Sequence, residues 1–118
     1  MKREYRVRKH SDFDRIIQGG RKIKSLHFNL YYLPAPSEES HGYIGIAVSK
    51  ANGNAVKRVK EKRQVRAILA KTGFEKEKVY LIIVIRPSYN PGAFHENEAE
   101  LLEKLELIKK DYLNWKTR

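Results

Sequence analysis

The feature that most constrains the fold is the run VYLIIVI at residues 79–85, because consecutive apolar side chains are costly to leave in water on either face of a strand. Its short length, its β-branched side chains and the Arg86-Pro87 pair that closes it favour a strand over a helix segment. We therefore expect a central strand that is buried on both faces.

Two further segments alternate between faces as half-buried strands do. The first, LHFNLYYL at 26–33, separates into Leu26, Phe28, Leu30 and Tyr32 against His27, Asn29, Tyr31 and Leu33. The second, GYIGIAVS at 42–49, places Ile44, Ile46 and Val48 inward and Gly45 and Ala47 on the opposite face. We expect these two strands to form an antiparallel hairpin, joined by the polar connection 34–40. The small residues of the second strand either relieve crowding or open a groove beside Asn29 and Tyr31.

Three helices are predicted around these strands. The first starts at Ser11 as its N-cap and stops at Gly19-Gly20. The second runs from Gly53 or Asn54 to Lys71. The third follows the turn NPG at 90–92 and carries an apolar core stripe, which consists of Leu101, Leu105, Ile108, Tyr112 and Trp115.

These elements predict one α+β domain that spans residues 1–118. The expected architecture is a small two-layer sandwich of order α-β-β-(β)-α-β-α. The bracketed element stands for short strand pieces between Ser49 and Asn54.

The chain carries a net charge of +11 that is concentrated in particular segments. Residues 50–71 hold eight basic side chains and one acid, whereas residues 94–111 hold six acids and three bases. A small domain with one basic side usually meets a polyanion, so we expect nucleic acid, with an anionic membrane surface as the weaker alternative. The lack of cysteine, of a signal-peptide core and of a long apolar run predicts a cytoplasmic protein without disulfides or a membrane span.

No arrangement of residues predicts an active site in this chain. The four histidines lack zinc-site spacing, and the glycines form no nucleotide-binding loop. The serines have no recognisable base partner, and the acids of the third helix are expected mostly on a solvated face; these acids are Glu96, Glu98, Glu100, Glu103 and Glu106. We therefore predict no catalytic residue and no protein-bound metal.

The second helix is the predicted nucleic-acid contact. Arg58, Lys62 and Arg66 fall on one sector of a helical wheel, Lys60 and Arg63 flank another, and Glu61 is the only acid nearby. Arginine and lysine meet phosphate oxygens and gain from counterion release. The predicted RNA-binding set is Asn54, Lys57, Arg58, Lys60, Lys62, Arg63 and Arg66.

RNA is favoured over DNA by the neighbouring surface. Phe13, Ile17, Asn29 and Tyr31 offer apolar and stacking contacts of the kind that unpaired bases use. The alternative for Phe13 and Ile17 is an ordinary place in the core.

Five segments of the sequence, taken together and in order, make the chain resemble the protein subunit of bacterial ribonuclease P. The resemblance rests on YRVRKHSDFDRIIQGGR, FNLYYL, GYIGIAVSKANGNAVKR, KRQVRAI and LIIVIRP. It implies a left-handed β-α-β crossover, against the usual rule. The family's arginine-asparagine-arginine motif is Arg58-Val59-Lys60 here, and Glu61 stands where an aliphatic residue is usual.

The resemblance also implies a function and partners. The RNA subunit would cleave precursor tRNA by magnesium-dependent hydrolysis, so Mg²⁺ would belong to the RNA. This chain, a monomer outside the ribonucleoprotein, would bind ribonuclease P RNA and hold the 5′ leader of precursor tRNA against Phe13, Ile17, Asn29 and Tyr31. The alternative is a structural RNA-binding protein, such as a ribosomal component.

Overall fold

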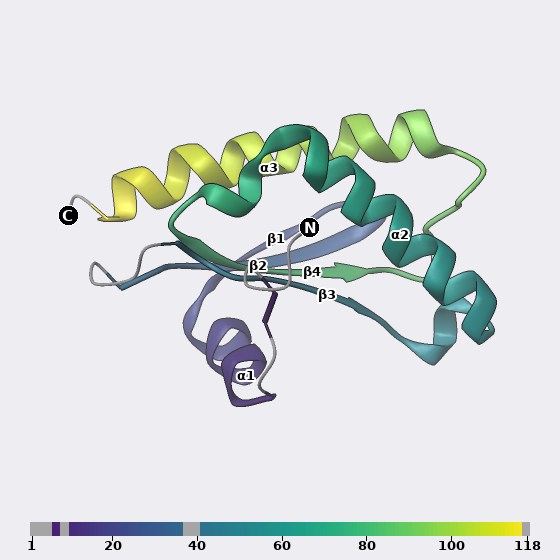
Figure 1. Ribbon diagram of the computed structural model, residues 1–118, viewed down its shortest axis with the longest axis horizontal. Helices are drawn as coiled ribbons and strands as arrows, with labels where there is room; N and C mark the ends of the chain where they lie inside the picture. The colour runs from purple at the N-terminus through teal and green to yellow at the C-terminus, as the bar shows by residue number, and fades with distance from the viewer. Residues whose placement is uncertain (1–5, 8–9, 37–40, 117–118) are drawn as a thin grey trace.

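The computed structural model describes residues 6–7, 10–36 and 41–116 and shows one sheet with three α-helices (Figure 1). The strands are β1 (Arg21–Lys24), β2 (Phe28–Pro34), β3 (Ile44–Val48) and β4 (Val79–Ile85). The helices are α1 (His10–Gly19), α2 (Ala55–Thr72) and α3 (Phe94–Lys116), with short 3-10 helices at Lys50–Asn52 and Phe74–Lys76. The predicted α+β fold is confirmed. The ends of the predicted domain at 1–118, and residues 37–40 of the predicted connection, lie outside the described residues.

The apolar run is central in the sheet, whose strand order is β1-β2-β4-β3. β4 pairs antiparallel with β2 and parallel with β3, and all its residues except Val84 are buried. The predicted hairpin of 26–33 with 42–49 is wrong, because β4 lies between these strands and gives each an apolar neighbour. The extra strand was also expected in the wrong place: it is β1, before β2, whereas Lys50–Asn52 is a 3-10 helix.

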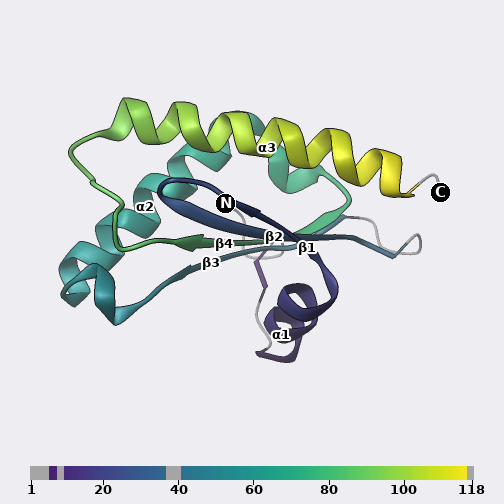
Figure 2. The same cartoon turned by 180° about the vertical axis from the view of Figure 1, so that it is seen from behind.

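The β3-α2-β4 unit has the left-handed sense that the resemblance implied. In Figure 1, β3 lies nearer the viewer than β4, both strands run from left to right, and α2 returns above them. The view from behind in Figure 2 places β1 and β2 in front instead. The chain therefore turns counterclockwise as it moves away from the viewer, which is the rare hand for such a crossover.

Helices α2 and α3 cover one face of the sheet, and α1 covers part of the other (Figures 1 and 2). The main core lies under α2 and α3 and includes Phe28, Leu30, Tyr32, Val65, Ile68 and Leu69. The predicted stripe of α3 is confirmed: its first four members are buried there, and Trp115 packs against them half buried. This face of the sheet is closed.

Helix α1 packs on the opposite face through Ile16, which is buried with Ala35, Tyr80 and Ile82. The helix begins at His10, so the prediction of Ser11 as its N-cap is wrong: Ser11 lies within the first turn. At its end, a Cβ on Gly20 would lie 2.6 Å from the carbonyl oxygens of Ile16 and Tyr32. Glycine therefore permits the close connection from α1 into β1.

Most of the predicted acids of α3 are exposed, as expected, but Glu100 and a further acid, Asp111, contact the strands. Glu100 accepts hydrogen bonds from the backbone N–H of His27 at 2.8 Å and from the Ser25 hydroxyl. Farther along the helix, Asp111 accepts bonds from Arg21 at 2.7 and 2.8 Å and from the Tyr32 hydroxyl at 2.8 Å. These acids fasten α3 to β1 and β2.

Candidate nucleic-acid interface

Helix α2 begins close to the predicted position because two residues shape its first turn. Gly53 has a φ of 122°, which favours glycine. Asn54 is the N-cap, and its side-chain oxygen accepts a hydrogen bond from the backbone N–H of Lys57 at 2.9 Å. Asn54, a predicted RNA contact, thus also has a structural role, and it is exposed.

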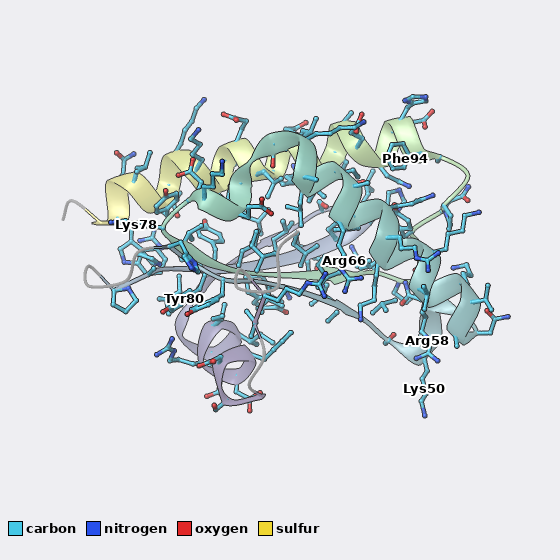
Figure 3. The ribbon with its side chains drawn as sticks, viewed as in Figure 1. Lys50, Arg58, Arg66, Lys78, Tyr80 and Phe94 are labelled. Carbon is cyan, nitrogen blue, oxygen red and sulfur yellow. The ribbon has the colours of Figure 1, made fainter. Side chains whose placement is uncertain are left out.

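Arg58, Lys62 and Arg66, which we call the cationic edge, follow one another along the side of α2 that faces β3. They are half buried, because they border the residues that seat the helix on the sheet. Figure 3 shows Arg58 and Arg66 along this edge, with Lys50 beyond them. Within the described part of the chain, none of the three forms an ion pair.

A third guanidinium, that of Arg6, approaches the cationic edge from the N-terminal segment. Arg6 forms a parallel bridge with Ile44 of β3, and the Val7 N–H donates to the Ile44 carbonyl at 3.1 Å. Burial and the positive charge of Arg6 lower the pKa of Arg66. An anion at this edge would offset both the like-charge repulsion and the lost hydration.

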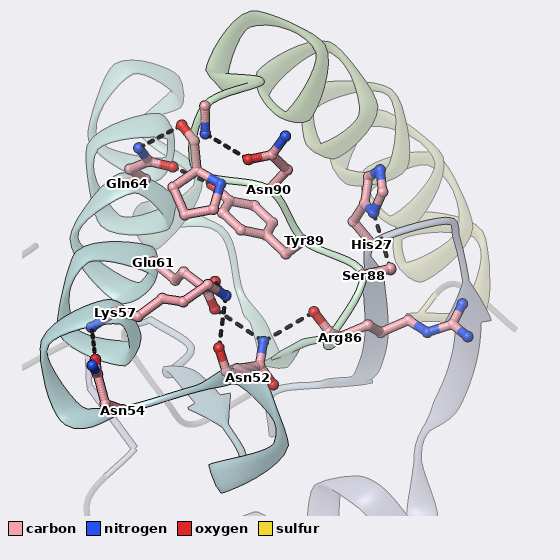
Figure 4. Close-up of polar contacts among 12 residues, drawn as sticks. His27, Asn52, Asn54, Lys57, Glu61, Gln64, Arg86, Ser88, Tyr89 and Asn90 are labelled. Carbon is pink, nitrogen blue, oxygen red and sulfur yellow. Dashed lines mark hydrogen bonds and ion pairs between the residues drawn. The ribbon is translucent and has the colours of Figure 1, made fainter.

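Lys57, another predicted RNA contact, is directed toward the protein (Figure 4). Its ammonium donates to Glu61 and to the backbone carbonyl of Asn52, each at 2.6 Å. The Asn52 amide donates to the second oxygen of Glu61 and to the Arg86 carbonyl, each at 2.9 Å. Because the Glu61 side chain is fully buried, its carboxylate depends on these partners. The structure therefore separates Lys57 from the other cations of α2.

Lys60 and Arg63 lie on the exposed side of α2, together with Val59, which is 47% exposed. Since successive helix residues turn by about 100°, Arg58 and Lys60 point in roughly opposite directions. The Arg58-Val59-Lys60 segment therefore presents one cation at the cationic edge and one away from it.

The predicted leader contacts lie on the sheet face that carries α1. Asn29 and Tyr31 of β2 are half buried there, as are Val84 and Ala47 of the neighbouring strands; we call these four residues the open face. Tyr31 and Phe13 pack against the same small cluster around Ile16. The structure thus brings all four predicted residues to this side of the sheet, Phe13 and Ile17 on α1 and Asn29 and Tyr31 on β2.

Of the two alternatives for the small residues of β3, the structure supports relief of crowding, at Gly45. A Cβ on Gly45 would lie 2.7 Å from the Phe13 ring, so glycine relieves crowding under that side chain. Ala47 is half buried and belongs to the open face. Phe13 is therefore partly a core residue, whereas Ile17, one turn later on α1, is 39% exposed.

Two features of this region were not predicted from the sequence. Asn52 is buried and supports Glu61, although a polar residue in an N-G-N turn predicts exposure. Lys22 and Lys24 lie beside the open face, because they belong to β1, the strand that was not expected there. The alternation in RKIK was the signal that would have found this strand.

Elsewhere, one pocket lies against α3, where acids predominate among the charged side chains. It lies between the turn at 25–27 and α3 and is lined partly by Glu96, Glu100 and Glu103, which would repel an anion. In residues 6–7, 10–36 and 41–116, no three His, Cys, Asp or Glu side chains are grouped as metal ligands would be. No helix of this part of the chain is long and apolar enough to cross a membrane.

These observations define a class: a small basic α+β protein with a left-handed crossover, a cationic helix edge and a half-covered sheet face. The family model described as Ribonuclease P matches residues 1–109. The chain belongs to the bacterial ribonuclease P protein family, whose members are components of a tRNA-processing ribonucleoprotein.

Individual relatives agree with this assignment. The ribonuclease P protein component of Listeria innocua is 35% identical over 109 residues, which cover 91% of this chain and 90% of that protein. The Staphylococcus aureus RNase P protein superposes with a TM-score of 0.76 at 29% identity, covering 89% of this chain and 95% of that one. The Thermotoga maritima RNase P protein gives 0.73 at 25% identity, covering 85% and 94%.

Proposed function

We propose that this chain binds the catalytic RNA of ribonuclease P through α2 and holds the 5′ leader of precursor tRNA on the open face. The observation that carries the proposal is a set of α2 cations that have no ion-pair partner among the described residues: Arg58, Lys60, Lys62, Arg63 and Arg66. Helix α2 and the open face lie on opposite sides of the sheet beside its edge strand β3, so one RNA assembly can reach both surfaces around that edge.

The contribution of the chain is electrostatic and positional. Its cations offset the repulsion between two RNA molecules, and Tyr31 offers a ring on which an unpaired base stacks. The hydrolysis itself, with its Mg²⁺, is assigned to the RNA subunit, so no residue of this chain is given a catalytic or metal-binding role. A monomer in the cytoplasm remains the expected state.

The first test compares precursor with mature tRNA, using the chain assembled with a bacterial ribonuclease P RNA. We expect tighter binding of the precursor and a smaller preference in Tyr31→Ala, by roughly 1 to 3 kcal/mol. Equal binding of both tRNAs by the unchanged protein would refute the leader role. It would favour a structural RNA-binding protein, such as a ribosomal component, instead.

The second test addresses the cationic edge. Replacing Arg58, Lys62 and Arg66 by alanine should weaken binding to the RNA subunit and reduce the slope of log affinity against log salt, by about 0.7 to 0.9 for each phosphate that is no longer bound. The matched control replaces Lys76, Lys78 and Lys110, which removes the same charge; Lys78 lies at the other end of the molecule from Arg58 (Figure 3). Equal salt slopes for the two triple variants would show that the cationic edge does not contact the RNA subunit.

A further inference from the structure

Strand β1 divides its four side chains between the two faces of the sheet. Arg21 reaches Asp111 of α3 at 2.7 Å, and Ile23 packs against the main core. Because side chains alternate along a strand, Lys22 and Lys24 point to the opposite face, where α2 and α3 are absent. Both lysines are exposed.

The strand register places these lysines beside the proposed leader contacts. Lys22 lies opposite Tyr31 and Lys24 lies opposite Asn29 in the antiparallel pair of β1 and β2. The Lys22 ammonium is 5.5 Å from the centre of the Tyr31 ring. Within the described residues, neither lysine has an acidic partner, so the charge of each faces solvent next to the open face.

One row of residues crosses the sheet where α1 leaves it uncovered: Lys24, Asn29, Val84 and Ala47. Figure 1 shows α1 beneath the left half of the sheet, whereas the C-terminal ends of β3 and β4 lie to the right. Since neighbouring strands are about 4.8 Å apart, this row spans about 14 Å. It leads from the β3 side, near the cationic edge, to the lysines of β1.

The Asn29 side-chain oxygen lies within this row and is buried. Among the described residues it has no hydrogen-bond partner, although an amide can donate and accept. Single-stranded RNA suits the exposed part of this surface, because its bases stack on aromatic rings while its phosphates require cations at the side.

We propose that Lys22 and Lys24 bind backbone phosphates of the leader, so that the single strand crosses the open face from β3 to β1. This inference rests on the proposed function, since it extends the leader contact by one strand. It makes β1 a second phosphate-binding element, separate from the cations of α2.

The test uses the chain assembled with the RNA subunit and a series of precursor tRNAs whose leaders are shortened one nucleotide at a time. The double variant Lys22→Ala/Lys24→Ala should bind the longest leader about tenfold more weakly at low salt. Its salt slope should fall by about 0.7 for each phosphate that the variant no longer binds. The deficit should vanish once the leader is too short to reach β1, and mature tRNA should bind unchanged.

The matched control is Lys76→Ala/Lys110→Ala, which removes two exposed lysines that have no ion pair in the described residues. It should leave the dependence on leader length intact. A tenfold deficit that is the same for every leader and for mature tRNA would overturn the proposal, as would no deficit at all.

Tyr31→Ala separates failure of this inference from failure of the proposed function. If Tyr31→Ala weakens leader binding and the lysine variant does not, the leader lies on the open face but does not reach β1. If the unchanged protein shows no preference for a leader of any length, the proposed function fails as well.

Discussion

The two faces of the sheet use the same strands differently. In β2, Leu30 is fully buried under α2 and α3, whereas its neighbours Asn29 and Tyr31 are half buried on the other side. At the sheet centre both faces are apolar and buried: Ile82 on the α1 side and Ile83 on the other are both fully buried. The difference lies in the cover that each face receives.

Helix length explains this difference. Helices α2 and α3 have 18 and 23 residues, whereas α1 has 10. Ten helical residues span about 15 Å and the seven residues of β4 about 23 Å, so α1 cannot cover its face. A closed face stabilises the fold, and a partly covered face retains surface for a ligand.

The largest expected effect concerns stability on the closed face. Leu30→Ala should lower the free energy of unfolding by about 4 kcal/mol, because the site is fully buried and a cavity would remain. Tyr31→Ala, one residue away, should cost less and should chiefly alter leader binding. Urea unfolding followed by circular dichroism checks both variants, and an equal loss would contradict the contrast between the faces.

The second prediction concerns the buried Glu61 carboxylate of α2 and its ion pair with Lys57. Lys57→Ala leaves the buried Glu61 carboxylate without its cation and should lower the free energy of unfolding by about 3 kcal/mol. This value is at the lower end for buried ion pairs, because the Lys57 side chain is 40% exposed. The control Lys60→Ala, an exposed lysine on the same helix, should change stability by less than about 0.5 kcal/mol. Thermal unfolding at neutral pH measures the difference.

A double variant sharpens that result. Lys57→Met/Glu61→Leu replaces the pair by apolar side chains and should restore most of the stability lost in Lys57→Ala. If it also retains the affinity for the RNA subunit, Lys57 is a structural residue. A loss of affinity in a fully stable double variant would return Lys57 to the RNA-binding set.

Local patterns predicted much of this fold. The run at 79–85 identified β4 at its observed bounds, and the alternation at 26–33 separated the two faces of β2 correctly. The stripe of α3 was identified because helical spacing is a property of neighbouring residues. In each case the signal lies within a single segment.

The failures concern contacts between segments. Strand pairing was wrong because no local pattern shows that β4 enters between β2 and β3. A helical wheel treats all cations alike, and it did not show that Lys57 turns toward Glu61 and Asn52. The candidate site was therefore predicted as a set of residues, whereas its separation into a cationic edge, an internal pair and an open face required the structure.

The third prediction uses alkaline pH to probe the closed face. Burial, together with the hydrogen bond to Asp111, raises the pKa of Tyr32 to about 12, and burial raises the pKa of Tyr89 to about 12. Both exceed the value near 10 of an unfolded tyrosine, so their contribution is complete below pH 10 and is lost as pH rises toward 12. Each should contribute about 2 to 3 kcal/mol to that loss.

Tyr32→Phe provides the control for this titration. The variant is less stable at neutral pH because it lacks the bond to Asp111, but its stability should fall less steeply above pH 10. The free energies of unfolding of the variant and the unchanged protein, plotted against pH, should therefore converge at high pH. Parallel curves would mean that Tyr32 does not titrate with the fold.

The smallest expected effect concerns Gly45, which lies under Phe13 on the same side of the sheet as the open face. In Gly45→Ala the new Cβ would lie 2.7 Å from the Phe13 ring and 2.8 Å from the Ile82 methyl group, so both side chains must shift. The cost should be about 1 kcal/mol, because the crowded atoms are ends of side chains and alanine suits a strand better than glycine. Since Phe13 would move, the free-energy preference for precursor over mature tRNA should fall by more than the free energy of unfolding. Titrations with both tRNAs measure the preference, and urea unfolding measures the stability. A more stable variant with unchanged preference would show that Phe13 does not shape the leader contact and acts only as core.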